Sequence, residues 1–526
     1  MNNIFKRYLT LILALVLVSS VCCLFAGRKE GLFIDEVYTY GLSNSYYTPF
    51  VADIKDGNMI DKIITHGELL DYMTVGEDDA FAVGSVYYNQ SKDVHPPLYY
   101  WLFNFVSSLD RGSLRYTAGL ILNYIIYIAA LVFLYKLAYS LFDSRSIASA
   151  AVVLYGLSVI GLSTMLMIRM YVLLTLETVL LAYFIVLLMR ERKKTYYFSI
   201  ALTIFAGLMT QYYFVFYAFF VCLAFLIHEL VKKNYRSAIL FSVSALLGVA
   251  ALFLAFPPFI RQLTADALVS GGSALDNAKN TTMYFSRLSG FIADAVHRMK
   301  AIVIAALVFL LVCIIRLPQI AAAVKSGKIS FKGFLVIIPA FVTFAVVSIV
   351  SPVNELRYIY NIIPLFALCV CSLLYMAEVS FKETKKSPAI KNGILILFAA
   401  LALWEARCLP PDYLYDEYSD YDALLMQHSN APCVYFDNNY SSSLTYDMMQ
   451  IMLFDDIFVT NDTASSAMKD YIGDSDEVVV FIDISKDWAS GYDSKEILDG
   501  LLRNTDFTSA ESLYSNGFSD VYLLRK

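Results

Sequence analysis

The run YLTLILALVLVSSVCCLFA at residues 8–26 is followed by FIDEVYTY at residues 33–40, where two adjacent carboxylates stand among aromatic and apolar side chains. At roughly 19 residues the first run is long enough to span a membrane. Lys6 and Arg7 precede it and no A-x-A cleavage site follows, so we expect a retained anchor rather than a cleaved signal peptide. Carboxylates beside a membrane are costly to hold, and the acidic pair therefore calls for a functional explanation.

Composition predicts a polytopic α-helical membrane protein. Hydrophobic residues make up 58% of the 526 residues and charged residues 16%, and the mean hydropathy is +0.59. Soluble proteins carry about 25% charged residues. Further apolar runs follow the first and give about eleven predicted spans, at residues 116–141, 147–166, 170–189, 196–211, 212–230, 237–256, 299–318, 332–351, 358–378 and 392–407. The composition shows no basic nucleic-acid-binding surface.

The distribution of basic residues predicts the orientation of these spans. If the chain crosses the membrane alternately from a cytoplasmic N-terminus, the clustered bases fall on the cytoplasmic side, as the positive-inside rule requires. They are Arg145, the run from Arg190 to Lys194, Lys232, Lys233, Arg236, Arg316, Lys325, Lys328, Lys332, Lys382, Lys385, Lys386 and Lys391. The same path places the loop 31–115 and the tail from Cys408 outside. We therefore expect a multi-pass protein of the cell membrane, of bacterial type.

The tail predicts a small α/β domain. Apolar strand-like runs occur at 433–436, 456–460, 477–484 and 521–524, with helical candidates at 446–453 and 494–502 between them. It has no glycine-rich phosphate loop. We expect residues 1–407 to form the transmembrane module and residues 408–526 an accessory domain. Cys408 and Cys433 would form a disulfide or remain free thiols, and the sequence leaves both alternatives open.

Asp35 and Glu36 are the candidate catalytic residues. In one interpretation they are a solvated pair at the end of the first span. In the other, the apolar residues around them bury the pair partly, and burial together with like charge raises the pKa of one carboxyl. One member would then serve as a general base near neutral pH.

Three arginines lie at predicted outer ends of spans, where the positive-inside rule leaves arginine rare. They are Arg115, Arg169 and Arg357. Guanidinium groups bind phosphate esters bidentately, so these residues are candidates for a phosphate site. The alternatives are an internal ion pair with Glu355 for Arg357 and snorkelling toward lipid phosphate for Arg169.

His95 lies in the segment DVHPPLYYW at residues 93–101. Its two prolines fix the backbone and predict a stiff turn that leads into an amphipathic stretch. His95 would contact a phosphate or, with Glu36, a divalent metal, although a lone histidine is more often a hydrogen-bonded structural residue. The sequence requires no cofactor, and a metal is optional.

These motifs resemble the GT-C glycosyltransferases. The resemblance rests on the acidic pair after the first span, HPPLYY at 95–100, the arginine at 115, R-x-Y at 169–171, and R-Y at 357–358 followed by Pro364. The most similar branch contains the protein O-mannosyltransferases and the aminoarabinose transferase of lipid A, which are glycosyltransferase family 39-like. The turn at residues 210–213 departs from relatives that carry His or Lys there.

The resemblance implies an inverting enzyme that takes a sugar from a polyprenyl-phosphate donor and transfers it to an extracytoplasmic acceptor, which is a glycopolymer, a lipid or a protein. Asp35 would deprotonate the acceptor, with Glu36 in support. The expected donor phosphate ligands are Arg169, Arg357, Arg115 and His95. The expected contacts to acceptor or sugar are Tyr38, Tyr99, Tyr100, Gln211 and Tyr358.

Three other functions are compatible with the sequence. A flippase or transporter for a lipid-linked sugar would share the outward arginines, but transporters tend to bind at the midplane between repeated halves, and the sequence shows no such repeat. A polymerase or ligase would use a pyrophosphate-linked donor. The tail alternatively has a receptor or structural role.

Overall fold

The computed structural model describes residues 2–264, 274–381, 387–438, 443–485 and 491–526, and the chain divides into two compact units. The membrane unit comprises residues 1–27 and 120–412, and the mixed unit comprises residues 28–119 and 413–526. The first external loop is thus grouped with the tail, whereas the sequence predicted a division at residue 408.

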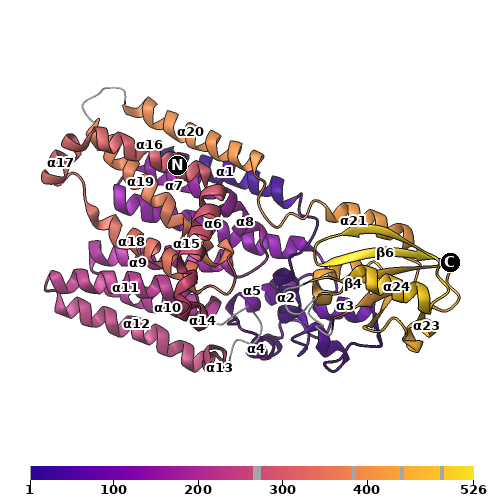
Figure 1. Cartoon of the computed structure of the whole chain (residues 1–526). Helices are drawn as coiled ribbons and strands as arrows, with labels where there is room; N and C mark the ends of the chain where they lie inside the picture. Colours follow the sequence, from indigo (N-terminus) through magenta and orange to yellow (C-terminus); the bar gives the residue numbers. More distant parts are fainter. Residues whose placement is uncertain (1, 265–273, 382–386, 439–442, 486–490) are drawn as a thin grey trace. The chain divides into compact units, whose positions relative to one another are not determined.

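The membrane unit is helical, which confirms the predicted fold class (Figure 1). Its helices are α1 (Asn2–Ala26), α6 (Tyr116–Phe142, whose first residues belong to the mixed unit), α7 (Arg145–Gly156), α8 (Val159–Leu166), α9 (Tyr171–Glu191), α10 (Lys194–Thr210), α11 (Phe214–Val231), α12 (Tyr235–Ala255), α13 (Pro258–Thr264), α14 (Ala274–Lys279), η2 (Thr281–Met283), α15 (Tyr284–Arg298), α16 (Lys300–Ile315), α17 (Leu317–Lys325), η3 (Phe331–Gly333), α18 (Phe334–Val350), η4 (Leu356–Ile362), α19 (Ile363–Ser380) and α20 (Ser387–Cys408).

A helix forms at every predicted apolar run, but the number of spans differs from the prediction. Within the described residues, seven helices are long and apolar enough to cross a membrane, or up to nine if each of two bent pairs counts as one span. The pairs are α7 with α8, bent by 64°, and α15 with α16, bent by 92°. The predicted count of about eleven also included α10, which has only 17 residues, and α20, whose first side chains lie outside the described residues.

The break between α7 and α8 follows from local hydrogen bonding. Ser158 caps α8, and its hydroxyl accepts a hydrogen bond from the Gly161 N–H at 3.1 Å. The Tyr127 hydroxyl donates to the carbonyl of Gly156, the last residue of α7, at 3.1 Å. Side-chain groups thus satisfy backbone groups that a continuous helix would pair internally.

The mixed unit contains one six-stranded sheet with the strand order β1-β3-β2-β4-β6-β5. Strand β2 runs parallel to β3 and β4, and the other pairs are antiparallel. The strands are β1 (Lys62–Thr65), β2 (Cys433–Phe436), β3 (Asp456–Thr460), β4 (Glu477–Asp483), β5 (Ser509–Ser515) and β6 (Ser519–Arg525). The helices are α2 (Ile34–Asn44), η1 (Val51–Lys55), α3 (His66–Met73), α4 (Val83–Lys92), α5 (Leu98–Ser107), α21 (Tyr418–Leu425), η5 (Met426–His428), η6 (Ser443–Tyr446), α22 (Met448–Ile451), α23 (Ser466–Ile472) and α24 (Ser494–Asn504).

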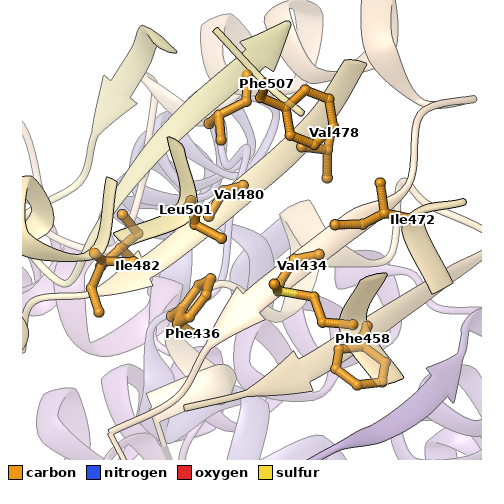
Figure 2. Close-up of a cluster of buried hydrophobic side chains, with 12 residues drawn as sticks. Val434, Phe436, Phe458, Ile472, Val478, Val480, Ile482, Leu501 and Phe507 are labelled. Carbon is orange, nitrogen blue, oxygen red and sulfur yellow. The ribbon is translucent and has the colours of Figure 1, made fainter. Parts of the chain in front are cut away.

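The tail therefore has the predicted α/β character, and its core lies against the parallel strands. Figure 2 shows the buried apolar cluster, in which Val434 and Phe436 of β2 and Val480 of β4 meet Leu501 of α24. Strand β4 is buried on both faces after its first residue, as expected of a central strand in a covered sheet. The Asp493 carboxylate caps α24 by accepting from the Lys495 N–H at 3.0 Å.

Of the two alternatives left open for Cys408 and Cys433, the structure shows free thiols. Cys433 is completely buried at the start of β2. A buried thiol in a central strand packs as a small apolar side chain.

Asp447 gives the mixed unit a testable pH dependence. It is completely buried, and its carboxylate accepts hydrogen bonds from Ser519 Oγ at 2.5 Å, Asn516 Nδ2 at 2.7 Å and the Tyr435 hydroxyl at 3.0 Å. Burial raises the pKa of Asp447 to about 6, and the three hydrogen bonds oppose the shift. An unfolded aspartate titrates near pH 3.9, so between about pH 4 and 6 the folded state binds more protons than the unfolded state.

We therefore expect the free energy of unfolding of the mixed unit to fall as pH rises from about 4 to about 6, by at most about 3 kcal/mol. Above about pH 6 this contribution should no longer change. In Asp447→Asn this contribution to the pH dependence of the free energy of unfolding should disappear. Pulse proteolysis of the tail in the full-length protein, in urea at pH 4, 5, 6 and 7, measures the difference between the two proteins. Parallel stability profiles for the wild type and the variant would contradict the assignment.

Candidate active site

The acidic pair lies in the first turn of α2. The backbone N–H of Phe33 donates to Glu36 Oε2 at 2.7 Å, which satisfies one of the free donors at the start of the helix. Glu36 is completely buried, whereas Asp35 is only partly buried. Two neighbouring carboxylates therefore occupy different environments.

Glu36 forms a buried ion pair that the sequence prediction missed. Lys29 Nζ lies 3.0 Å from Glu36 Oε2, and both side chains are fully shielded from solvent. The same ammonium donates to the Tyr413 carbonyl at 2.7 Å and lies 5.7 Å from the centre of the Tyr415 ring. Burial lowers the pKa of Lys29, and the charge and hydrogen bond of Glu36 oppose this shift. The available signal was a lysine on the predicted outer side of the first span, where the positive-inside rule leaves bases rare.

Helix α5 supports α2 from within the loop. The rings of Tyr40 and Phe103 meet edge to face with centroids 4.8 Å apart, and the Asn104 amide donates to the Ser43 carbonyl at 2.9 Å. The Tyr40 hydroxyl donates to the backbone carbonyl of Arg115 at 3.0 Å, while the Arg115 residue itself is exposed. Burial raises the pKa of Tyr40. The second half of α2 is thus held by contacts with α5 and with the backbone at Arg115.

The HPP turn places its histidine beside an acid. His95 Nδ1 lies 2.9 Å from Asp93 Oδ2, and both side chains are mostly buried. Tyr99 and Tyr100, expected to contact acceptor or sugar, are completely buried, and their rings meet edge to face at 6.1 Å. Tyr38, on α2, is partly exposed. Asp93 is the partner of His95 that the sequence analysis did not identify, although it lies only two residues away.

Arg169 lies in the membrane unit, in the short connection between α8 and α9. The residue is 3% exposed, and its backbone N–H donates to the Met167 carbonyl at 2.7 Å. The Asn123 amide on α6 holds this connection by donating to the carbonyls of Met165 at 3.0 Å and Met167 at 2.6 Å. Arg169 is therefore a buried residue on a turn whose backbone is held by hydrogen bonds from α6.

Arg357 lies at the start of η4 and is paired. Its Nη1 lies 2.6 Å from Glu355 Oε2, and the arginine side chain is 10% exposed. This is the internal ion pair that the sequence left open as an alternative. The neighbouring Tyr358 ring lies 5.1 Å from that of Tyr213, and the Tyr213 N–H donates to the amide oxygen of Gln211 at 3.1 Å. Arg357, Tyr358 and Gln211 thus belong to one neighbourhood of the membrane unit, joined through Tyr213.

Arg287 on α15 is a further base that the sequence analysis did not select. Its guanidinium donates to the backbone carbonyl of Ser351, and to Ser351 Oγ at 3.2 Å. Ser351 immediately follows α18, so this contact ties α15 to the turn that leads to Arg357. An arginine four residues into a helix gives no distinctive sequence signal.

The predicted site residues fall in both units. Asp35, Glu36, Tyr38, His95, Tyr99, Tyr100 and Arg115 belong to the mixed unit, and Arg169, Gln211, Arg357 and Tyr358 belong to the membrane unit. Among the described residues, no group of three or more His, Cys, Asp or Glu side chains is arranged to hold a metal ion. Glu36 Oε2, considered together with His95 as an optional metal ligand, is buried against Lys29 and the Phe33 N–H.

Residues 94–260 match the family model described as dolichyl-phosphate-mannose-protein mannosyltransferase. The matched segment covers less than half of the chain and includes His95, Arg115, Arg169 and Gln211. The match confirms the resemblance expected from the motifs, and with it the glycosyltransferase class. No curated protein sequence matches the chain.

Solved structures also match the chain, at low sequence identity. The crystal structure of ArnT from Cupriavidus metallidurans in the apo state is 10% identical, with 97% of each chain covered and a TM-score of 0.45. The same protein bound to undecaprenyl phosphate gives 10% identity, 97% coverage of each chain and a TM-score of 0.43. The archaeal oligosaccharyltransferase AglB from Archaeoglobus fulgidus, in complex with an inhibitory peptide and a dolichol-phosphate, is 11% identical, with 98% of this chain and 74% of that chain covered and a TM-score of 0.42.

Proposed function

We propose that this chain is an inverting glycosyltransferase that moves a sugar from a polyprenyl-phosphate donor to an acceptor outside the cytoplasm. The observation that carries the proposal is the family match over residues 94–260, whose description names a dolichyl-phosphate-linked mannose as donor. The acceptor is a cell-envelope glycopolymer, a lipid or a protein.

The reaction is a single displacement at the anomeric carbon. The acceptor oxygen forms the new bond to that carbon, and the bond from the carbon to the phosphate oxygen breaks with its electron pair leaving on the phosphate. The acceptor proton passes to a base. Inversion follows because the acceptor and the leaving group lie on opposite faces of the sugar.

Asp35 is the proposed base, and Glu36 supports it without contacting substrate. The different burial of the two carboxylates supports this division: Glu36 is closed in by Lys29, whereas Asp35 is partly exposed. A positioned general base contributes typically about 10²–10⁴-fold to the rate. Asp35 lies on a helix whose start is fixed by the buried pair, which is a suitable support for a group that must be positioned accurately.

Arg169 and Arg357 are proposed to stabilise the charge that develops on the departing phosphate, with Arg115 and His95 as further phosphate contacts. Fixed cationic donors in a site that excludes water lower such a barrier substantially. The burial of Arg169 and Arg357 supports their part. Arg357 would exchange its contact with Glu355, which is 46% exposed, for the phosphate.

Tyr38, Tyr358 and Gln211 remain the proposed contacts to sugar or acceptor. Tyr38 and Tyr358 are partly exposed, whereas Gln211 is buried. The proposal omits Tyr99 and Tyr100 as ligand contacts because their completely buried rings pack against each other and the Tyr99 ring stacks on that of Phe103.

The proposed orientation has a cytoplasmic N-terminus and an extracytoplasmic mixed unit in the cell membrane. In a variant with Cys23 and Cys408 replaced by serine, we expect Lys495→Cys to react with a membrane-impermeant maleimide in intact cells. Lys194→Cys, at the first residue of α10, would react only after permeabilisation, because the proposed orientation places the basic cluster around it in the cytoplasm. Both lysines are exposed. The opposite labelling pattern would contradict the orientation.

The function is tested by incubating proteoliposomes that contain the purified full-length chain with labelled sugars on polyprenyl monophosphate and on polyprenyl pyrophosphate, together with an envelope extract as acceptor. Transfer from the monophosphate, with one polyprenyl phosphate released for each sugar moved, is the expected result. Transfer from the pyrophosphate alone would indicate a polymerase or ligase. Labelled lipid that crosses the bilayer without sugar transfer would indicate a flippase.

A further inference from the structure

We infer that the C-terminal segment completes the loop that carries Asp35, and that Lys29 is the positioning residue that joins them. This inference rests on the proposed function, because it assigns a role to the residues behind the proposed base. It concerns the mixed unit alone, in which residues 28–119 and 413–526 fold as one body.

The first connection lies directly before the acidic pair. Backbone and side chains of residues 28–33 contact the tail at successive positions. Arg28 pairs with Asp416 at 2.5 Å, Lys29 Nζ donates to the Tyr413 carbonyl at 2.7 Å, the Glu30 N–H donates to the Leu414 carbonyl at 2.8 Å, and the Phe33 ring lies 5.8 Å from that of Tyr413.

Tyr413 and Tyr415 have backbone φ angles of 69° and 58°, in the left-handed region that non-glycine residues rarely adopt. Such a conformation costs free energy and persists only where the surrounding contacts determine it. The segment of the tail that receives Lys29 is therefore held in one specific shape.

The second connection is a strand. Strand β1 of the loop pairs antiparallel with β3 of the tail and forms the edge of the sheet, with Ile64 opposite Ile457. Asp61 Oδ1 accepts hydrogen bonds from Thr460 Oγ1 at 2.9 Å and Ser465 Oγ at 3.1 Å. At the other end of β1, the His66 N–H donates to the Asp455 carbonyl at 2.8 Å. The loop therefore contributes a strand to the domain of the tail.

Lys29 connects these contacts with the tail to the helical turn that carries the proposed base. Its ammonium bridges the tail carbonyl of Tyr413 and the carboxylate of Glu36, and Glu36 in turn fixes the start of α2 through the Phe33 N–H. Asp35 precedes Glu36 in the same helical turn. A shift of the tail at Tyr413 would be transmitted through two hydrogen bonds to the helical turn that carries the proposed base. Small displacements of a catalytic group have large effects on rate.

The test separates positioning from charge balance. Lys29→Met leaves a buried carboxylate without its counter-ion, so loss of activity in that variant alone would be uninformative. The double variant Lys29→Met/Glu36→Gln buries no charge and keeps an acceptor for the Phe33 N–H, yet it removes the bridge to Tyr413. Arg28→Gln is the matched control, because it removes the adjacent and exposed contact with the same tail segment.

We expect the double variant to keep a melting temperature close to that of the wild type, to lose at least tenfold in kcat and to keep its KM for the donor within about twofold. Hydrogen–deuterium exchange of residues 33–44 in the full-length protein should become faster in the double variant and stay unchanged in Arg28→Gln. Wild-type kcat and wild-type exchange in the double variant would overturn the inference. The exchange measurement does not depend on transfer, so a wild-type protein without transferase activity would refute the proposed function alone.

If the double variant does not fold, Gly31→Ala tests the same contact between residues 28–33 and the tail. A Cβ at Gly31 would lie 2.4 Å from the Tyr418 ring of the tail, whereas a Cβ at Gly67, in the same loop, would have as its nearest neighbour Thr65 Oγ1 at 3.9 Å. Gly31→Ala should reduce kcat and accelerate exchange in residues 33–44, while Gly67→Ala should do neither. Equal kcat and equal exchange in the two alanine variants would contradict a positioning role for the contact between residues 28–33 and the tail.

Discussion

We expect Asp35→Asn to reduce kcat for sugar transfer by at least about 100-fold, because a general base contributes about 10²–10⁴-fold to the rate. Asparagine preserves the size of the side chain but cannot take the acceptor proton. Donor binding should stay within about twofold of the wild type, because the proposed role of Asp35 is toward the acceptor. Transfer rates and donor affinity measured in the same nanodisc preparation give both quantities.

Asp110→Asn is the control for this variant. Asp110 is an exposed acid of the same loop, shortly after α5, and neutralising it should leave transfer within about twofold of wild type. Wild-type transfer in Asp35→Asn would remove Asp35 as the base. A loss of donor binding equal to the loss of rate would instead assign Asp35 to the donor site.

Arg169→Gln should reduce kcat by about 10²–10³-fold, the size of effect found when a preorganised group that stabilises transition-state charge is removed. The donor affinity should fall as well, because the guanidinium also binds the phosphate in the ground state. Glutamine keeps a polar side chain at this buried position but carries no charge. The measurement is the concentration dependence of transfer with purified polyprenyl-phosphate donor, together with gel filtration to verify folding.

Arg190→Gln provides the comparison, since Arg169 precedes α9 and Arg190 lies in its last turn. Arg190 donates to the Ser140 carbonyl and is exposed, so its removal should leave the rate unchanged. Equal rates in both variants would mean that Arg169 does not act on the departing phosphate.

The sequence was sufficient to predict the strands of the tail that lie at the centre of the sheet. The predicted bounds of β2 and β3 agree with the structure, because each contains an apolar run and ends directly before a polar residue, Asp437 or Asn461. Strand β1 could not be found in the same way. It is four residues long, and its partner β3 lies nearly four hundred residues away in the chain. Pairing of this kind depends on tertiary structure, which local sequence patterns do not record.

In the candidate site, too, some features could be predicted from the sequence and others depend on tertiary structure. Hydrophobic surroundings suggested partial burial of the acidic pair as one of two interpretations, but the sequence could not show that Glu36 is completely buried and Asp35 only partly. The assignment depends on Lys29 and on the Tyr413 carbonyl, a backbone group that no residue type identifies. Likewise, the aromatic residues of HPPLYY resembled ligand contacts, whereas Tyr99 and Tyr100 belong to the interior of the loop.

The grouping of the loop with the tail changes how the chain should be divided in experiments. A truncation at residue 408 would remove the partners of β1, of Lys29 and of Gly31 together. Loss of activity after such a truncation would therefore report on the folding of the loop. Point variants in the full-length chain are the informative choice.

The account depends most directly on a single displacement at the anomeric carbon, and the anomeric configuration of the product tests this. A donor of known configuration is turned over by the full-length enzyme, and the new glycosidic bond is examined by NMR spectroscopy. Inversion is the predicted result, with Asp35 as base and polyprenyl phosphate as the leaving group. Retention would contradict the account, because it would require a second displacement and a nucleophile that the proposed mechanism does not contain.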